Sequence, residues 1–141
     1  MGKLWIWSFL LMFPFKSTHA DDADTRQKVM LPDIVKRHML DAMHDNLLAV
    51  HEIQAALDSG DLNKAGDIAE TRFGMSSLAS HNAAHIASLM PQAMRQIGIE
   101  MHVAASRFAA SAKEGDMVHA MDSFAAINQQ CAACHAAYRL D

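Results

Sequence analysis

The chain has 141 residues, two cysteines and a formal net charge of −4 at pH 7, and this length suits one modest domain. Without the two lysines of the first 20 residues, ten basic residues face sixteen acidic ones. The resulting charge, near −6, argues against nucleic acid or an anionic membrane surface as the partner. Both cysteines lie in one motif near the C-terminus, so none is left for a structural disulfide.

Residues 1–20 have the features of a secretory signal peptide. Lys3 supplies a basic start, an apolar run follows from Leu4 to Phe13, and Thr18-His19-Ala20 provides a small-residue cleavage site. The run is shorter than the roughly 20 residues that a membrane-spanning helix needs. We therefore expect export to the periplasm and no stable membrane insertion after cleavage, with an uncleaved anchor as the alternative.

We expect residues 21–31 to form an N-terminal extension and residues 32–141 to form one helical domain. Glycine, proline and β-branched residues are scarce there, whereas alanine, methionine and leucine dominate. The first helix is predicted from Pro32 to about Leu57, where turn residues interrupt the pattern. Its apolar positions recur at helical spacing, with two leucines widening the stripe: Val35, Met39, Met43, Val50, Ile53 and Leu57, with Leu40 and Leu47.

Three further helices are predicted in the rest of the chain. The second runs from about Leu62 to Met90, although two glycines weaken the pattern. Pro91 ends it and starts the third helix, which stops near Gly115. The fourth begins at Met117, and its apolar stripe is continuous with the C-terminal cysteine motif. Short connections make successive helices antiparallel neighbours, which predicts an up-and-down four-helix bundle.

The C-terminal motif, Cys131-Ala132-Ala133-Cys134-His135, is the attachment signature of c-type haem. On a helix its three functional residues share one face, since they stand three and four positions apart. Two such thiols can add across the two vinyl groups of a porphyrin, and His135 can then bind the iron as the proximal ligand. The alternative is a redox-active Cys-x-x-Cys, which normally opens a helix that follows a strand. Here the motif closes a helix, so we predict one covalent haem in the bundle core.

A helical bundle that ends in Cys-x-x-Cys-His-x-x-Tyr-Arg resembles the cytochrome c′ family, the class II c-type cytochromes. Here the pattern reads Cys131, Cys134, His135, Tyr138 and Arg139. The resemblance implies a bacterial periplasmic haem protein, and dimerisation through the first two helices is common in that family. It is looser in the middle of the chain, where the family's long connection between the second and third helices is reduced to the turn at Pro91.

The resemblance also implies where the far side of the iron lies. Val35 to Met43 resembles the first-helix pattern around the distal haem face. One register places Leu40 at the distal position with Met43 one turn later, which predicts a five-coordinate iron open to NO or CO. A slip of one residue places Met39 there as a sixth ligand, which favours electron transfer. Core filling is the alternative role for either methionine.

Basic residues are expected at the haem edge. The family's basic residue in the first helix falls on Lys36 or Arg37 in this sequence, and the two remain open. The arginine that matches Arg139 lies beside the proximal haem face in the family. A surface arginine that favours the helix dipole is the alternative for Arg139.

We conclude that the sequence predicts an electron carrier that needs a redox partner protein. A gas-binding haem protein is the alternative, and a bundle that handles metals through Met and His is a weaker one. The latter would use His81 and His85, four apart, with Met101 or His102. No Ser-His-Asp, paired-carboxylate or phosphate-binding pattern stands out, so we expect no enzymatic activity.

Overall fold

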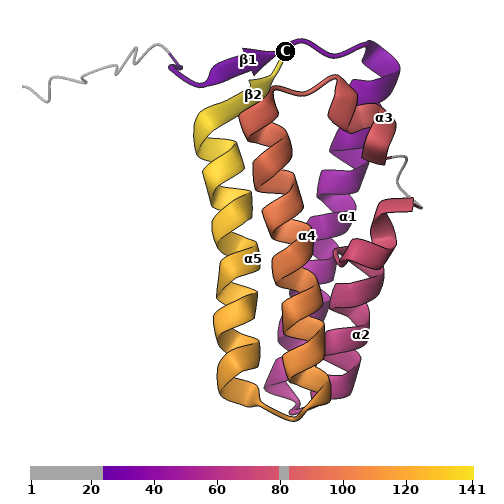
Figure 1. Cartoon of the computed structure of the whole chain (residues 1–141), viewed down its shortest axis with the longest axis vertical. Coiled ribbons are helices and arrows are strands. Elements are labelled where there is room, and N and C mark those ends of the chain that lie inside the picture. The colour runs from indigo at the N-terminus through magenta and orange to yellow at the C-terminus, as the bar shows by residue number, and fades with distance from the viewer. Residues whose placement is uncertain (1–23, 80–82) are drawn as a thin grey trace, which may run out of the picture.

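The computed structural model describes residues 24–79 and 83–141, and they are mostly helical (Figure 1). The all-α prediction is therefore confirmed. The predicted signal peptide lies outside the described residues. Within them, no helix is long and apolar enough to cross a membrane. The elements in chain order are β1 (Gln27–Val29), α1 (Asp33–Asp58), α2 (Leu62–Arg72), the short 3₁₀ helix η1 (Met75–Ala79), α3 (Ala83–Ser88), α4 (Gln92–Lys113), α5 (Met117–Ala137) and β2 (Tyr138–Leu140).

The turns at one end of the molecule follow local sequence rules. Gly60 and Gly115 adopt positive φ angles of 75° and 76°, which glycine tolerates without steric cost, and each ends a helix. The next residue but one begins a new helix in both cases. Asp61 and Asp116 cap α2 and α5, because their side chains accept hydrogen bonds from the backbone amides three positions on. These signals explain why the predicted ends of the first and third helices, and the predicted starts of the second and fourth, are close to those observed.

The prediction of one second helix from residue 62 to 90 is wrong. α2 ends at Arg72, and the Gly74 amide closes the last turn on the carbonyls of Ala69 and Glu70. A Cβ at Gly74 would overlap the Glu70 carboxylate, so this break requires glycine. A long connection containing η1 and α3 then leads to α4. The inference that this connection is reduced to a turn at Pro91 is therefore also wrong.

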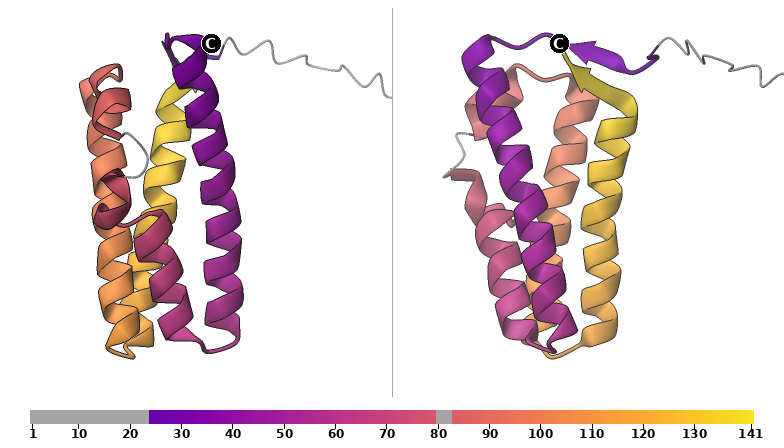
Figure 2. Two further views of the ribbon diagram at one scale, coloured as in Figure 1. Left: turned by 90° about the vertical axis from the view of Figure 1, so that its right-hand side faces the viewer. Right: turned by 180° about the vertical axis from the view of Figure 1, so that it is seen from behind.

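The long helices lie side by side, but their contacts are uneven (Figure 2). α4 packs against both α5 and α2, and α1 packs against α2. By contrast, α1 and α5 approach each other at very few points. α1 is therefore held mainly through α2.

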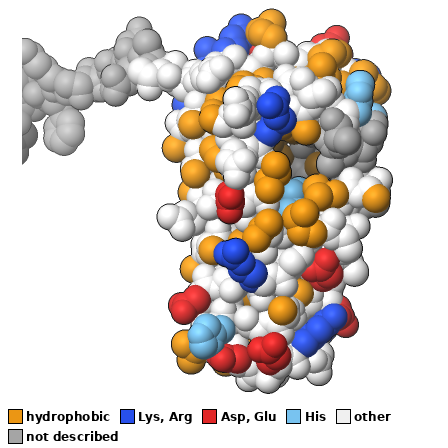
Figure 3. All heavy atoms as spheres, viewed as in Figure 1, with side chains coloured by type: hydrophobic (Ala, Val, Ile, Leu, Met, Phe, Trp, Pro, Cys, Tyr) orange, Lys and Arg blue, Asp and Glu red, His pale blue; other side chains and the backbone are white. Residues whose placement is uncertain are grey.

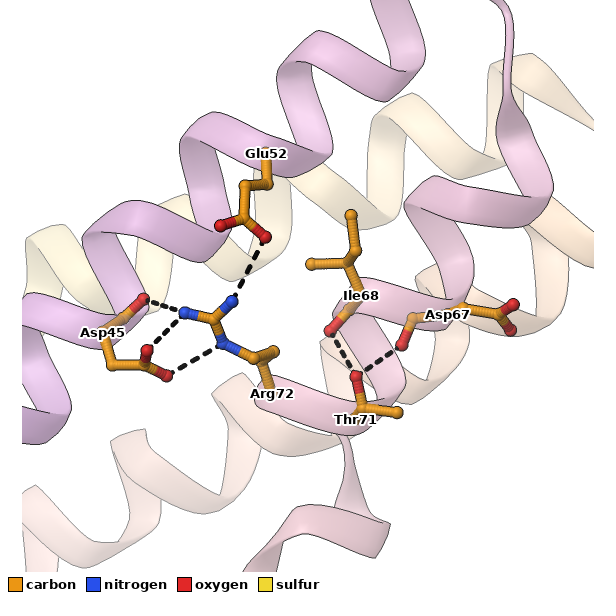
Figure 4. A network of polar contacts seen from close by, with 6 residues as sticks. All are labelled: Asp45, Glu52, Asp67, Ile68, Thr71 and Arg72. Carbon is orange, nitrogen blue, oxygen red and sulfur yellow. Dashed lines mark hydrogen bonds and ion pairs between the residues drawn. The ribbon is translucent and has the colours of Figure 1, made fainter.

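An arginine on α2 fastens α1 in place (Figure 4). Arg72 donates from Nε to Asp45 Oδ2 at 2.9 Å and from Nη2 to the Asp45 backbone carbonyl at 3.0 Å. It also donates from Nη1 to Glu52 Oε2 at 3.2 Å. A bidentate arginine–carboxylate contact fixes orientation as well as distance. The network thus sets the position of α1 along α2, despite the sparse contact with α5.

Two hydrophobic clusters fill the interior. The alanine–phenylalanine cluster joins the turn-end halves of the helices: Ala49, Ile53, Ala56, Ala65, Ala69, Phe73, Ala104, Ala105, Phe108, Ala112, Ala120, Phe124 and Ile127. The methionine-rich cluster lies toward the end where the two strands meet. Its buried members are Val29, Met39, Met94 and Tyr138, with Leu31, Met43, Ile86, Met90, Ile97, Cys134 and Leu140 partly buried around them.

Two leucines of the predicted first-helix stripe are not in the core. Leu40 is 48% exposed and Leu47 is 69% exposed, so the expectation that they widen the buried stripe is wrong. Alanines at positions 49 and 56 take part of the buried face instead. Small residues there let α1 approach α2 closely, and the leucines are left on the side of α1 away from that contact.

The two ends of the described chain meet in a short parallel pair of strands, β1 and β2 (Figure 1). Gln27 pairs with Tyr138, Lys28 with Arg139 and Val29 with Leu140. The Lys28 ammonium also meets the Asp141 carboxylate at 2.6 Å. Tyr138 is buried and begins β2, directly after the last residue of α5.

Candidate functional site

The Cys-x-x-Cys-His motif occupies the last two turns of α5. Cys131 and Cys134 are half-buried free thiols, and Cys134 packs against the methionine-rich cluster. His135 is exposed at the end of the helix. The helix continues without a break to Ala137, as the spacing argument required.

The electrostatics of the two thiols argue against a redox-active pair. Burial raises the pKa of both Cys131 and Cys134, and the neighbouring Cys131 adds to the effect on Cys134. Redox-active Cys-x-x-Cys motifs instead lower the pKa of one thiol, which makes the reactive thiolate available near neutral pH. The environment here therefore keeps the Cys131 and Cys134 thiols protonated near neutral pH.

A cleft of about 280 Å³ opens beside the motif. Its walls come from the strand end of the molecule, with α1 on one side and α5 on the other. The lining residues are Arg26, Leu40, Met43, Met94, Cys134, His135, Tyr138, Arg139 and Leu140. Two leucines and two methionines make much of the lining apolar, and two arginines and a histidine supply polar groups. Such a mixture is typical of cofactor sites.

The cleft brings together most of the predicted distal and proximal residues. Leu40 and Met43 of α1 line it together with Cys134 and His135 of α5. Met39, the other predicted distal residue, is buried in the methionine-rich cluster and does not line the cleft. The structure therefore places Leu40 and Met43, rather than Met39, in the same cleft as His135.

The three predicted haem-edge residues differ in whether they line the cleft. Arg139 lines the cleft, whereas Lys36 and Arg37 do not. Arg26, which the sequence analysis missed, takes a place in the wall and donates from Nη1 to the His135 backbone carbonyl at 3.4 Å. No local pattern identifies Arg26, because the strand pairing brings it to the motif from more than 100 residues away.

The residues of this cleft fit a covalent porphyrin in their chemistry. Two thiols and an imidazole stand on one helix face, Leu40 and Met43 supply an apolar wall, and the buried Arg139 Nε makes no hydrogen bond. The volume lies just below the roughly 300–1,000 Å³ of typical ligand sites. α1 and α5 approach each other at very few points, so few contacts between these two helices oppose a widening of the cleft.

A larger hollow of about 410 Å³ lies between the other ends of α1 and α5, and it contains none of the motif residues. His51 lines it with Met117 and Met121, both of which are partly exposed. It lacks the thiols that covalent attachment needs. The motif residues Cys134 and His135 line the smaller cleft instead.

The second metal site predicted around His81 and His85 stays a prediction. His81 lies outside the described residues, and His85 is exposed. His102 Nδ1 donates to the Phe73 backbone carbonyl at 2.5 Å, which ties α4 to the end of α2. Among residues 24–79 and 83–141, no three histidine, cysteine or acidic side chains are grouped so that they could hold a metal ion.

Comparisons with protein-family models, with curated proteins and with solved structures found no match for this chain. The similarity to class II cytochromes therefore depends on the chain's own residues. Those residues are the motif at the end of α5, the Tyr138-Arg139 pair behind it and the first-helix segment that lines the same cleft.

Proposed function

We propose that this protein is an exported class II c-type cytochrome that binds one haem c and transfers single electrons. The observation that carries the proposal is the cleft, in which Cys134 and His135 of α5 lie with Leu40 and Met43 of α1. In this proposal α1, α2, α4 and α5 are the four helices of an antiparallel up-and-down bundle, and η1 and α3 belong to its long connection. The predicted signal peptide would deliver the chain to the periplasm, where its partner is a redox protein.

Each residue of the motif has a distinct role in the proposal. Cys131 and Cys134 would form the two thioether bonds, and the His135 imidazole would bind the iron from the proximal side. A bound haem would supply the one-electron iron couple. Leu40, Met43 and Met94 would exclude water from the porphyrin face, because their side chains form the apolar part of the wall. His135 is exposed, so a partner could approach the proximal edge closely.

A second candidate function is binding of NO or CO at a five-coordinate iron. It is favoured by Leu40, which lines the cleft but has no atom that can ligate iron, and by Met39, which is buried elsewhere. Met43 decides between the two candidates, since its thioether lies in the cleft and could take the sixth position. A ligating Met43 would raise the potential and support electron transfer.

Covalent haem attachment is tested by producing the full chain in a bacterium that has a c-type cytochrome maturation system. We expect periplasmic protein with one haem per chain, a thioether-type pyridine haemochrome spectrum and the mass of the cleaved chain plus haem. The double variant Cys131→Ala/Cys134→Ala should carry no covalent haem. Wild-type protein that is exported and folded but free of haem would contradict the proposal.

The sixth ligand is tested by the ferric spectrum of three proteins: wild type, Met43→Leu and Met39→Leu. If Met43 ligates the iron, wild type and Met39→Leu are low-spin and ignore CO after reduction, whereas Met43→Leu becomes high-spin and binds CO. A wild type that is already high-spin and binds CO supports the gas-binding candidate. Loss of the low-spin spectrum only in Met39→Leu would return the ligand role to Met39.

A further inference from the structure

Arg26 reaches the cleft from the segment just before β1. Its guanidinium donates from Nε to Asp24 Oδ1 at 2.9 Å and from Nη2 to Asp24 Oδ2 at 2.7 Å, and its Nη1 reaches the His135 carbonyl at 3.4 Å. This bidentate arginine–carboxylate contact orients the guanidinium plane. Arg26 therefore occupies a defined position at the cleft wall, although it lies in an extended segment.

Arg139 stands at the same wall with an unused donor. Its Nε is buried and makes no hydrogen bond, and it meets Asp24 Oδ2 only as an ion pair at 3.5 Å. A buried donor without an acceptor is costly, by roughly 1–3 kcal/mol, so such groups usually indicate a missing partner. The partner that suits a guanidinium best is a carboxylate or phosphate.

Asp24 is shared between the two arginines. The hydrogen bonds from Arg26 are the main reason that the pKa of Asp24 falls to about 2, and the charge of Arg139 adds to the effect. One carboxylate thus faces two guanidinium groups. The cluster keeps an excess of one positive charge at the cleft.

Strand pairing fixes this cluster against the motif. Lys28 is opposite Arg139 in the parallel register, so Arg26 lies two residues before the position that pairs with Arg139. Among the other charged groups nearby, Lys28 pairs with Asp141, and the charges of Lys36 and Arg139 also help to lower the pKa of that carboxyl. Neither lysine lines the cleft. Arg26 and Arg139 are therefore the arginine and lysine side chains that line the cleft among the described residues.

We propose that Arg26 and Arg139 form a carboxylate-binding site in the cleft and that it receives a propionate group of the covalently bound haem. The inference rests on the proposed function. Thioether attachment uses the two vinyl groups, so both propionates stay free to form ion pairs. Asp24 then acts as the internal partner that holds the two guanidinium groups together before the propionate arrives. The segment before the first helix thereby becomes part of the haem site.

The test uses holoprotein whose haem propionate carboxyls are labelled with ¹³C, and the carboxyl resonances are followed against pH. A guanidinium partner stabilises the ionised carboxylate and so lowers its pKa. Arg26→Gln should raise the pKa of one propionate by about one unit or more, and Asp24→Asn should lower it. Arg37→Gln is the matched control, since Arg37 is an exposed arginine that does not line the cleft, and it should leave both resonances unchanged.

Three outcomes would overturn the inference while leaving the haem proposal intact. One is labelled holoprotein in which Arg26→Gln titrates like Arg37→Gln. Another is a shift in Arg26→Lys as large as that in Arg26→Gln, which would indicate a loss of strand packing rather than of charge. A third is a shift of the same sign in Arg26→Gln and Asp24→Asn. Wild-type protein without covalent haem would instead refute the proposed function.

Discussion

The two hydrophobic clusters differ in their residue types and in how completely those residues are buried. In the alanine–phenylalanine cluster, most members are alanines and the large side chains are fully buried, with the Phe108 and Phe124 rings 5.7 Å apart at 46°. Small residues bring the helix backbones close, and the aromatic rings fill the remaining space. The methionine-rich cluster is smaller, and most of its members are only partly buried.

This difference separates a rigid half of the molecule from an adaptable one. Methionine is unbranched, with three rotatable side-chain bonds and a polarizable sulfur, so it can repack around a bulky group without a fixed complementary surface. The cleft with Cys134 and His135 lies beside the methionines, whereas the phenylalanines hold α2, α4 and α5 together at the turn end. Acidic side chains gather over that end on the face shown in Figure 3. We infer that the end with the cleft can open while the turn end keeps the helices aligned.

The largest loss of stability should come from a substitution in the alanine–phenylalanine cluster, the rigid half of the molecule. Phe108→Ala should destabilise the protein by about 3–5 kcal/mol, because Phe108 is fully buried and the cavity left by the ring cannot collapse among backbone-close alanines. Urea denaturation followed by circular dichroism measures the change. Ile99→Ala, on the same helix but 47% exposed, is the control and should cost far less. Similar costs for the two variants would contradict the division into two halves.

A smaller loss of stability is expected from a substitution at Gly66, where α2 approaches α4. A Cβ at Gly66 would lie 3.1 Å from Ala112 Cβ and 3.2 Å from the Ala109 carbonyl oxygen, and neither atom belongs to a flexible side chain. Gly66→Ala should lose about 1–3 kcal/mol to overpacking and regain up to about 1 kcal/mol of helix propensity. The net loss, on the order of 1 kcal/mol, is measured by the same denaturation. A more stable variant would show that the two helices can move apart.

The adaptable half should tolerate substitution. Met94→Leu changes shape but hardly changes volume, and swaps of this kind usually cost less than about 1.5 kcal/mol. We expect roughly half a kcal/mol for the protein without haem, measured by urea denaturation. A loss comparable to that of Phe108→Ala would mean that the methionine-rich cluster is packed as rigidly as the other.

The smallest expected effect on stability is a pH dependence that comes from His119 at the turn end. The hydrogen bond from His119 to the Asp116 carboxylate raises the pKa of His119 above its usual 6.5. The pair therefore stabilises the fold fully below pH 6.5, and this contribution is lost as pH rises through the raised pKa. Asp116→Asn keeps a helix-capping side chain but removes the charge, so the His119 pKa should fall toward 6.5 in an NMR titration. Asp122→Asn should lower it less, because Asp122 contributes less to the shift.

The sequence predicted the elements whose signals are local. α1 and α4 follow Pro32 and Pro91, the turns contain Gly60 and Gly115, and the motif marks α5. The break after α2 was missed, because it depends on the contact of Gly74 with Glu70 and on the anchoring of that turn to α4: Ser106 Oγ donates to Glu70 Oε2 at 2.7 Å. Periodicity along one chain carries no such information.

The candidate site also has one part that could be predicted from the sequence and one part that could not. The residues on α5 were predictable because Cys131, Cys134 and His135 stand at fixed spacing, whatever packs against them. The sequence could not decide whether Leu40 or Met39 lies in the cleft, because a rotation of α1 by one residue exchanges them. That rotation is set by contacts of α1 with Arg72 on another helix. Arg26 was invisible to the sequence analysis, because three-residue strands leave almost no pattern of their own.

The parallel pairing of β1 with β2 also bears on the order of folding. Gln27 of β1 pairs with Tyr138 of β2, so this contact closes a loop that spans nearly all of the described residues. Closing so long a loop costs entropy that only an assembled set of helices can offset. We therefore expect the strand pair to form late in folding, after the long helices have assembled. Until that step the cleft would lack Arg26, which the strand pair brings to the His135 backbone carbonyl.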